Sequence, residues 1–248
     1  MPQELKNAIA LIGEGDPSAN PAAKISAVQA IVDHASVCDV NRMDLSAAGA
    51  IPPLVALLDK GSDIQKRQCI KALQLLVTNN PLAVAFDNGG AVVQAGGLRP
   101  IIALFNASGK GDDSESTSDE SLEELAAATL RLIARSSANR SAIAKEGAIQ
   151  PLVALVKQGD ADEGARAEAA FALGSLVFDH AENRAAVSKE GGVKALSALA
   201  RSGTPRQQQT ASYALTALQP RTTVAEGEPP PPYEHKYEER GTMLGKYA

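Results

Sequence analysis

A segment that begins with glycine and continues as a short apolar stretch occurs four times in this chain and constrains its fold more than any other feature. The copy at Gly147 reads Gly-Ala-Ile-Gln-Pro-Leu-Val-Ala-Leu-Val, and the others start at Gly49, Gly96 and Gly191. The starts are 47, 51 and 44 residues apart. Self-similarity with a period in the forties is typical of helical solenoids, in which each unit packs on its neighbours. We therefore expect an elongated all-α array and not a globular enzyme core.

The composition favours close helix packing and excludes some classes of partner. Of the 248 residues, 44% are hydrophobic but only 3% are aromatic, and none is Trp. Small and aliphatic side chains must therefore fill the interior. The formal net charge is −5, and no Lys/Arg cluster is dense enough to follow a phosphate backbone, so we expect no nucleic-acid partner.

A second element recurs eight residues before each glycine. Asparagine occupies this position in all four copies, and arginine follows it in three of them. Because an Asn side chain can satisfy free backbone N–H groups, we expect each Asn to cap a short first helix that ends at the glycine. The asparagines are Asn41, Asn88, Asn139 and Asn183, and the arginines are Arg42, Arg140 and Arg184.

A third element follows a second glycine-containing turn and has the pattern small-x-x-x-Leu-x-x-Leu. Spacings of four and three residues place these side chains on one face of a helix, with the small residue where helices approach closely. Each repeat is therefore predicted to contain three helices. The copies are Cys69/Leu73/Leu76, Ala126/Leu130/Ile133, Ala169/Leu173/Leu176 and Ala211/Leu215/Leu218.

These three-helix units resemble armadillo repeats, in which two shorter helices meet at a glycine and a longer third helix lines the concave side of a right-handed superhelix. The resemblance covers residues 38–219 in four copies. Residues 1–37 match a second and a third helix only, and we expect this partial repeat to cap the array, since a terminal repeat must cover its neighbour's apolar face.

One repeat carries an insertion at about residues 107–121. The segment from Gly109 to Ser121 contains no apolar residue and is rich in Asp, Glu, Ser and Thr. A solvated acidic loop is expected there. Phosphorylation of its Ser and Thr residues, or binding to a basic partner, is the alternative.

The composition changes again in residues 220–248. Four consecutive prolines favour an extended polyproline II conformation, and Tyr233, Tyr237 and Tyr247 add aromatic side chains that a linker usually lacks. We expect this extended tail to contact another protein through those tyrosines and through Pro230 and Pro231. Residues 230–233 also match the Pro-Pro-x-Tyr ligand of WW domains, which makes a WW-domain protein a candidate partner.

The armadillo resemblance implies that partners bind the third helices. Nuclear-import adaptors of this family carry a ladder of Trp and Asn there, which this chain lacks, and catenin-type grooves are rich in Lys and Arg, of which only Lys71 fits. An apolar groove for a partner helix or extended segment remains, although Leu75, Leu125 and Leu132 would equally suit packing between adjacent third helices. The candidate groove residues are Gln68, Lys71, Leu75, Leu125, Leu132, Glu168, Phe171 and Tyr213.

No constellation of residues supports catalysis, a metal site or a cofactor. His34, His180 and His235 lie in separate parts of the sequence without a neighbouring nucleophile, and Cys38 and Cys69 are expected to be buried free thiols. No apolar run approaches the ~18 residues of a membrane helix, and no secretory leader is evident, so membrane insertion is not expected and a cytoplasmic location is.

The sequence therefore predicts a non-enzymatic scaffold or structural adaptor subunit of a multiprotein assembly. A cytoskeletal or ciliary assembly is suggested by analogy within the family. The alternative function is a regulatory adaptor of protein turnover or transport, recruited through the Pro-Pro-x-Tyr motif.

Overall fold

The computed structural model describes residues 1–13, 20–78, 87–107, 120–159 and 161–219. These residues form fourteen helices and no strand. An initial pair, α1 (Gln3–Gly13) and α2 (Pro21–Val37), is followed by four groups of three. The groups are α3 (Asp39–Ala47), α4 (Ile51–Lys60) and α5 (Asp63–Val77); α6 (Asn88–Gln94), α7 (Leu98–Ala107) and α8 (Leu122–Ile133); α9 (Ser137–Lys145), α10 (Ile149–Lys157) and α11 (Glu163–Val177); and α12 (Ala181–Lys189), α13 (Gly192–Ser202) and α14 (Pro205–Leu218).

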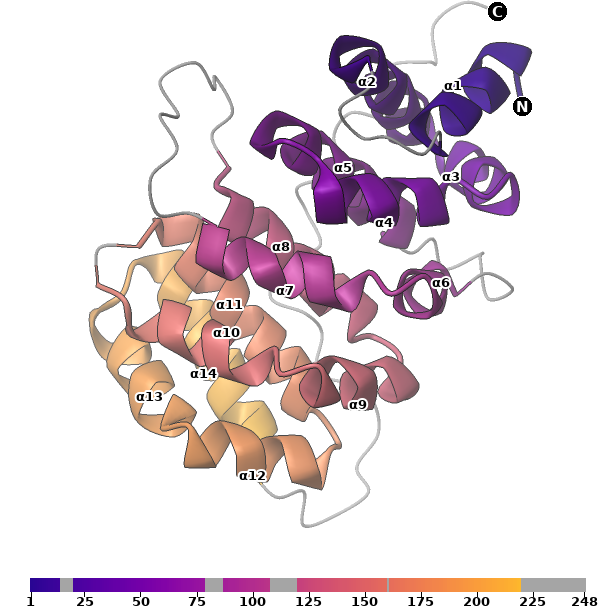
Figure 1. The fold of residues 1–248 in the computed structure, drawn as a ribbon. Coiled ribbons are helices and arrows are strands. Elements are labelled where there is room, and N and C mark those ends of the chain that lie inside the picture. The colour runs from indigo at the N-terminus through magenta and orange to yellow at the C-terminus, as the bar shows by residue number, and fades with distance from the viewer. Residues whose placement is uncertain (14–19, 79–86, 108–119, 160, 220–248) are drawn as a thin grey trace, which may run out of the picture.

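The helices stack into a curved array with the N-terminal pair at one end and α12 to α14 at the other (Figure 1). The second helix of each group lies in front of its third helix in this view, so the array has two layers. Consecutive third helices pack against each other from α2 through α5, α8 and α11 to α14. Almost all of the acidic insertion and the whole tail, with Pro230, Pro231, Tyr233, Tyr237 and Tyr247, lie outside the described residues.

The repeated glycines end the first helix of each group, as predicted. Gly49, Gly96, Gly147 and Gly191 all have φ between 77° and 85°, a left-handed conformation that other residues adopt only with strain. At Gly49 the backbone N–H donates to the carbonyl of Ser46, and the next N–H, of Ala50, reaches back to Leu45. These two backbone hydrogen bonds together terminate the helix and redirect the chain.

The recurring asparagines are not helix N-caps, and that prediction is wrong. Asn139, for example, is the third residue of α9, and α6 is capped by Asp87, which precedes Asn88. Each Asn side chain instead donates to a carbonyl at the end of the preceding third helix, where the last turn leaves carbonyls without a partner. The acceptors are His34 for Asn41, Leu76 for Asn88, Ile133 for Asn139 and Leu176 for Asn183.

The arginines that follow the asparagines act on the same helix ends. Arg42 and Arg184 each donate to one carbonyl at the end of α2 and α11. Arg140 is buried and donates to three: Ala134 and Arg135 after α8, and Phe178 after α11. Arg140 therefore joins two consecutive repeats.

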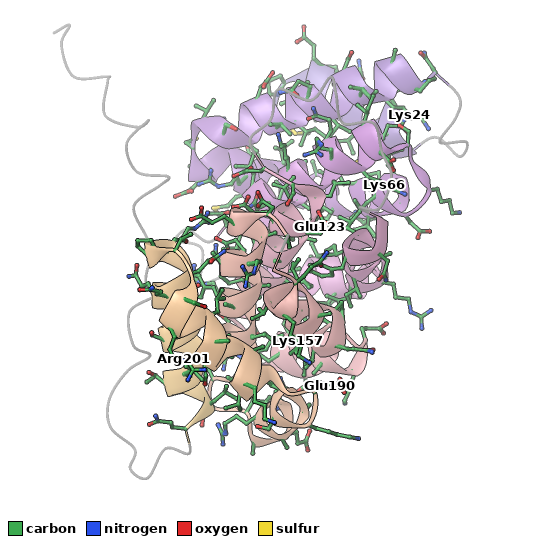
Figure 2. All side chains as sticks on the ribbon, turned by 90° about the vertical axis from the view of Figure 1, so that its left-hand side faces the viewer. Lys24, Lys66, Glu123, Lys157, Glu190 and Arg201 are labelled. Atoms are coloured by element: carbon green, nitrogen blue, oxygen red, sulfur yellow. The ribbon has the colours of Figure 1, made fainter. Side chains whose placement is uncertain are left out.

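The predicted core face of the third helices is confirmed in three repeats of four. The Cys69, Ala126 and Ala169 patterns are buried along their whole length. In α14, Ala211 is buried but Leu215 and Leu218 are only half-buried, because no described helix packs on its outer side. Lys157 at the end of α10 donates to the carbonyl of Glu190 at the end of α12, which adds a polar link between the last two repeats (Figure 2).

The two cysteines differ in environment. Cys69 lies in the core, and burial raises the pKa of its thiol to about 12. Cys38, expected to be buried as well, is exposed, because it is the single extended residue between α2 and α3. Its neighbours Val37 and Val40 are exposed too.

Candidate functional site

Six of the eight candidate groove residues are partly accessible on the third helices. Gln68, Lys71 and Leu75 are half-buried on α5, and Leu132, Glu168 and Tyr213 are half-buried on α8, α11 and α14. The structure thus distributes these six residues along four consecutive third helices.

Two candidate groove residues are not available to a partner in this structure. Leu125 is 1% exposed and belongs to the core, so the packing alternative describes it better. Phe171 is only 3% exposed. Its ring is covered by side chains from both neighbouring third helices.

The third-helix surface is open over α2 and α5. On α2, Ser26, Ala30, Asp33 and Val37 are exposed, and their spacing of four, three and four residues places them in one stripe. On α5, the corresponding stripe runs from the exposed Ile64 through the half-buried Gln68, Lys71 and Leu75. We name these eight residues the open stripe.

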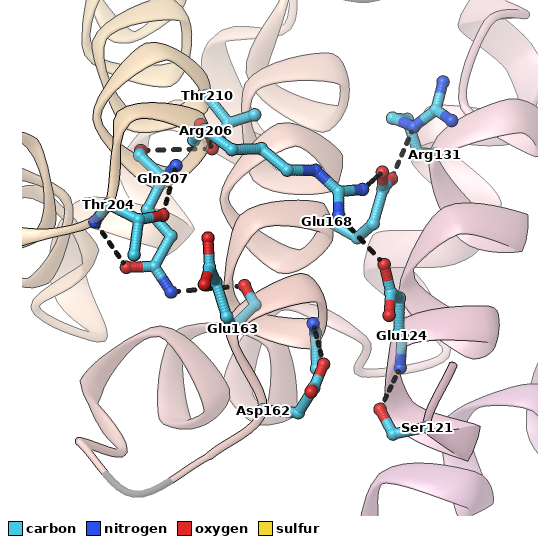
Figure 3. A network of polar contacts seen from close by, with 11 residues as sticks. Ser121, Glu124, Arg131, Asp162, Glu163, Glu168, Thr204, Arg206, Gln207 and Thr210 are labelled. Carbon is cyan, nitrogen blue, oxygen red and sulfur yellow. Dashed lines mark hydrogen bonds and ion pairs between the residues drawn. The ribbon is translucent and has the colours of Figure 1, made fainter. Parts of the chain in front are cut away.

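The surface is closed over α8, α11 and α14 by an ion-pair network (Figure 3). The Arg206 guanidinium on α14 lies between two carboxylates, with Nη2 2.8 Å from Oε1 of Glu168 on α11 and Nη1 3.1 Å from Oε1 of Glu124 on α8. Arg131 on α8 pairs with the other oxygen of Glu168 at 2.9 Å. Four charged side chains thus connect three repeats, and we name them the closed ladder.

Aromatic contacts complete the closure. The Arg131 guanidinium carbon lies 4.6 Å from the centroid of the Phe171 ring, within the range of a cation–π interaction. Tyr213 meets Phe171 edge to face with the centroids 5.1 Å apart. Glycines make this approach feasible, because a Cβ at Gly174 would lie 2.6 Å from the Tyr213 ring.

Burial and charge pairing shift the pKa values of Glu124 and Arg206 in the closed ladder. Burial raises the pKa of the Glu124 carboxyl, and the attraction of Arg206 offsets this only in part. For Arg206, burial acts to lower the pKa, but the combined attraction of Glu168 and Glu124 outweighs it and raises the pKa. Glu168 accepts hydrogen bonds from two arginines, whereas Glu124 accepts a side-chain bond from Arg206 alone.

Glu168→Gln is therefore expected to destabilise the protein more than Glu124→Gln. Gln has a single acceptor oxygen and no charge, so it can replace neither the second arginine bond nor the charge that assists both. The free energy of unfolding should fall by about 2 kcal/mol, against about 1 kcal/mol or less for Glu124→Gln. Urea unfolding of the full chain, followed by circular dichroism, measures both. Equal losses would contradict the central position assigned to Glu168.

The loss of stability in Glu124→Gln should depend on pH. A carboxyl whose pKa is raised by folding holds its proton to higher pH in the folded state, so its contribution to stability falls as the pH rises through that pKa. Glu124→Gln cannot titrate. Its destabilisation relative to the natural chain should therefore shrink between about pH 4 and pH 7, and a loss that grows over this range would be inconsistent with a raised pKa.

His180 contacts a serine hydroxyl, that of Ser141, which is distant in the sequence. His180 Nε2 lies 2.8 Å from Oγ of Ser141, 39 residues away. His180 Nδ1 accepts the backbone N–H of Asn183, which leaves the ring proton on Nε2. Nε2 therefore donates to Ser141, and a base that already carries its proton does not activate a serine. The pair caps α12 and joins two repeats.

Neither a metal cluster nor a membrane span is found in the part of the chain that the structure describes. Within these ranges, no group of three or more His, Cys, Asp or Glu side chains is arranged to hold a metal ion. No helix among them combines the length and the apolar character needed to cross a membrane.

Sequence reasoning missed three members of the closed ladder and the α2 half of the open stripe. Glu124 and Arg131 directly precede the predicted groove residues Leu125 and Leu132, and Arg206 lies seven residues before Tyr213. Their opposite charges were the available signal. The α2 stripe was missed because the partial repeat was considered only as a cap. Ser26, Ala30 and Asp33, at spacings of four and three residues, were the corresponding signal.

No protein-family model and no curated protein sequence matches this chain. Solved structures do match. A designed armadillo repeat protein is similar with a TM-score of 0.73 and 25% identity over 87% of this chain and 82% of that chain. Another, solved in complex with the peptide (KR)4, gives a TM-score of 0.71 at the same identity and coverage.

A natural protein shows the same fold at lower identity. The armadillo repeats only protein from Plasmodium falciparum matches with a TM-score of 0.67 and 17% identity, over 88% of this chain and 93% of that chain. The chain has three-helix repeats with a left-handed glycine between the first and second helix of each, and it is similar to solved armadillo repeat structures. It is therefore a right-handed armadillo-repeat solenoid.

Proposed function

We propose that this chain is a non-enzymatic scaffold that binds an extended segment of a partner protein on its third helices, within a larger complex. The open stripe is the observation that supports this most. It offers four exposed side chains on α2 and one exposed and three half-buried side chains on the adjacent α5, whereas the closed ladder already fills the same surface further along. A similar designed armadillo repeat protein is known in complex with a peptide.

The residues of the open stripe suit a backbone that lies close to the helices. Ser26 and Ala30 are small, so a partner chain can approach α2 closely. Asp33 and Lys71 offer opposite charges, and Val37 and Ile64 are 73% and 63% exposed, which provides apolar contacts at the ends. An extended peptide with alternating polar and apolar side chains fits this surface.

The remaining segments have supporting roles in this proposal. Residues 1–37 close the array at its N-terminal end, before the four repeats of residues 38–219. Residues 220–248 provide a second contact element through Pro230, Pro231, Tyr233, Tyr237 and Tyr247.

A display selection tests the open stripe. Peptides of about twelve residues selected against the purified full chain should bind it, and Ala30→Arg should weaken that binding by about tenfold or more, because the new side chain covers the path over α2. Fluorescence anisotropy measures the affinity.

Ala185→Arg is the matched control. Ala185 is an exposed alanine on α12, a first helix at the other end of the array, so the same change in size and charge is made away from the open stripe. Its affinity for the selected peptides should stay unchanged. Equal losses in the two variants, or no selected peptide at all, would refute the assignment.

A further inference from the structure

The Arg206 guanidinium lies between the carboxylates of Glu124 and Glu168, which belong to two other helices. Its guanidinium comes from a helix 82 residues beyond Glu124 and crosses α11 to reach α8. The two carboxylates are 10% and 12% exposed, while the Arg206 side chain is 30% exposed. The two acceptors thus lie deeper than the cation, which solvent can reach.

Glu168 has a second partner besides Arg206, and Glu124 packs closely on the neighbouring helix. Glu168 is fixed by Arg131 at its other oxygen. Glu124 lies over Gly164 of α11, where any Cβ would come within 2.3 Å of the carboxylate. A pair of carboxylates aimed at one point from two helices matches the fork of donors on a guanidinium better than the single ammonium of lysine.

The start of α14 does not depend on the Arg206 side chain. Thr204 and Gln207 form a reciprocal capping box at this helix end, and Gln207 also donates to the carbonyl of Glu163 (Figure 3). The Arg206 side chain can leave its position while the helix stays in place.

We propose that Glu124 and Glu168 form a guanidinium-binding position on the third-helix surface, which this chain occupies with its own Arg206 as an autoinhibitory contact. A partner segment that presents an arginine competes for the position and releases Arg206. The inference rests on the proposed scaffold function and extends the partner surface beyond the open stripe to the closed ladder.

Removal of the internal competitor tests this directly. N-acetyl-arginine amide, titrated into the full chain and followed by the NMR signal of the Gly164 amide, should bind Arg206→Ala about tenfold or more tightly than the natural chain. The gain should disappear in Arg206→Ala/Glu168→Gln. N-acetyl-lysine amide, which has the same charge, should bind Arg206→Ala more weakly than the arginine amide.

Arg206→Gln repeats the test with a polar side chain if the alanine variant loses its fold. Binding to neither variant, or a gain that persists without Glu168, overturns the proposal. This result is separable from the scaffold test, because the probe reports on Gly164 and the peptide selection reports on Ala30. Loss of peptide binding at the open stripe with intact arginine binding would reject the scaffold proposal alone.

Discussion

Replacing Arg140 by alanine is expected to lower the free energy of unfolding by about 3 to 4 kcal/mol, because three backbone carbonyls lose a charged donor at a buried site. Nε donates to Ala134 at 2.7 Å, Nη1 to Phe178 at 3.0 Å and Nη2 to Arg135 at 3.1 Å. The guanidinium also lies over the Phe178 ring at 5.2 Å. Urea unfolding followed by circular dichroism measures the loss.

Arg184→Ala is the matched control for this prediction. Arg184 has the same place in the next repeat but makes a single bond of 3.4 Å, to the carbonyl of Val177. Its removal should cost about 1 kcal/mol or less. If the two variants lose similar stability, the joint between α8 and α11 is not held by Arg140 in the way the hydrogen bonds indicate.

The contrast between these two arginines shows what a repeat pattern predicts. The period, the left-handed glycines and the core face of the third helices follow from local constraints, since a positive φ and a small residue at a close approach each leave a mark at one position. Asn139 and Arg140 also recur visibly. The predicted capping role of Asn139 is wrong because its partner lies at the end of the preceding helix, which local capping rules do not consider.

The closed ladder depends on geometry that no local pattern contains. Glu124 and Arg206 meet only because the array curves enough to bring the first turns of α8 and α14 within reach of one arginine side chain across α11. The sequence shows charges at those positions but not the curvature.

Phe171 illustrates the same limit for burial. An aromatic residue on the partner-facing stripe was a reasonable candidate for an exposed anchor. Arg131 and Tyr213, on two different helices, cover its ring. Gly174 permits this because it has no side chain in the space that the Tyr213 ring occupies.

Gly174→Val is the second variant with a large expected effect. A Cβ at this position would lie 2.6 Å from two ring carbons of Tyr213 and 3.0 Å from the Cα of Ala214, which is backbone and cannot turn away. Overpacking of this kind should lower the free energy of unfolding by about 3 kcal/mol, more than the few tenths gained in helix propensity. Thermal unfolding and urea unfolding both report the loss.

Gly159→Val provides the control, because nothing lies within 4 Å of a Cβ at Gly159. Its stability should change by about 0.5 kcal/mol or less.

A double-mutant cycle then separates the clash with Tyr213 from a general intolerance of α11 to larger residues. Tyr213→Ala removes the ring that meets the new side chain, so the loss in Gly174→Val/Tyr213→Ala should be smaller than the sum of the single losses by about 1 kcal/mol or more. Additive losses would mean that Tyr213 is not the residue that requires glycine at position 174.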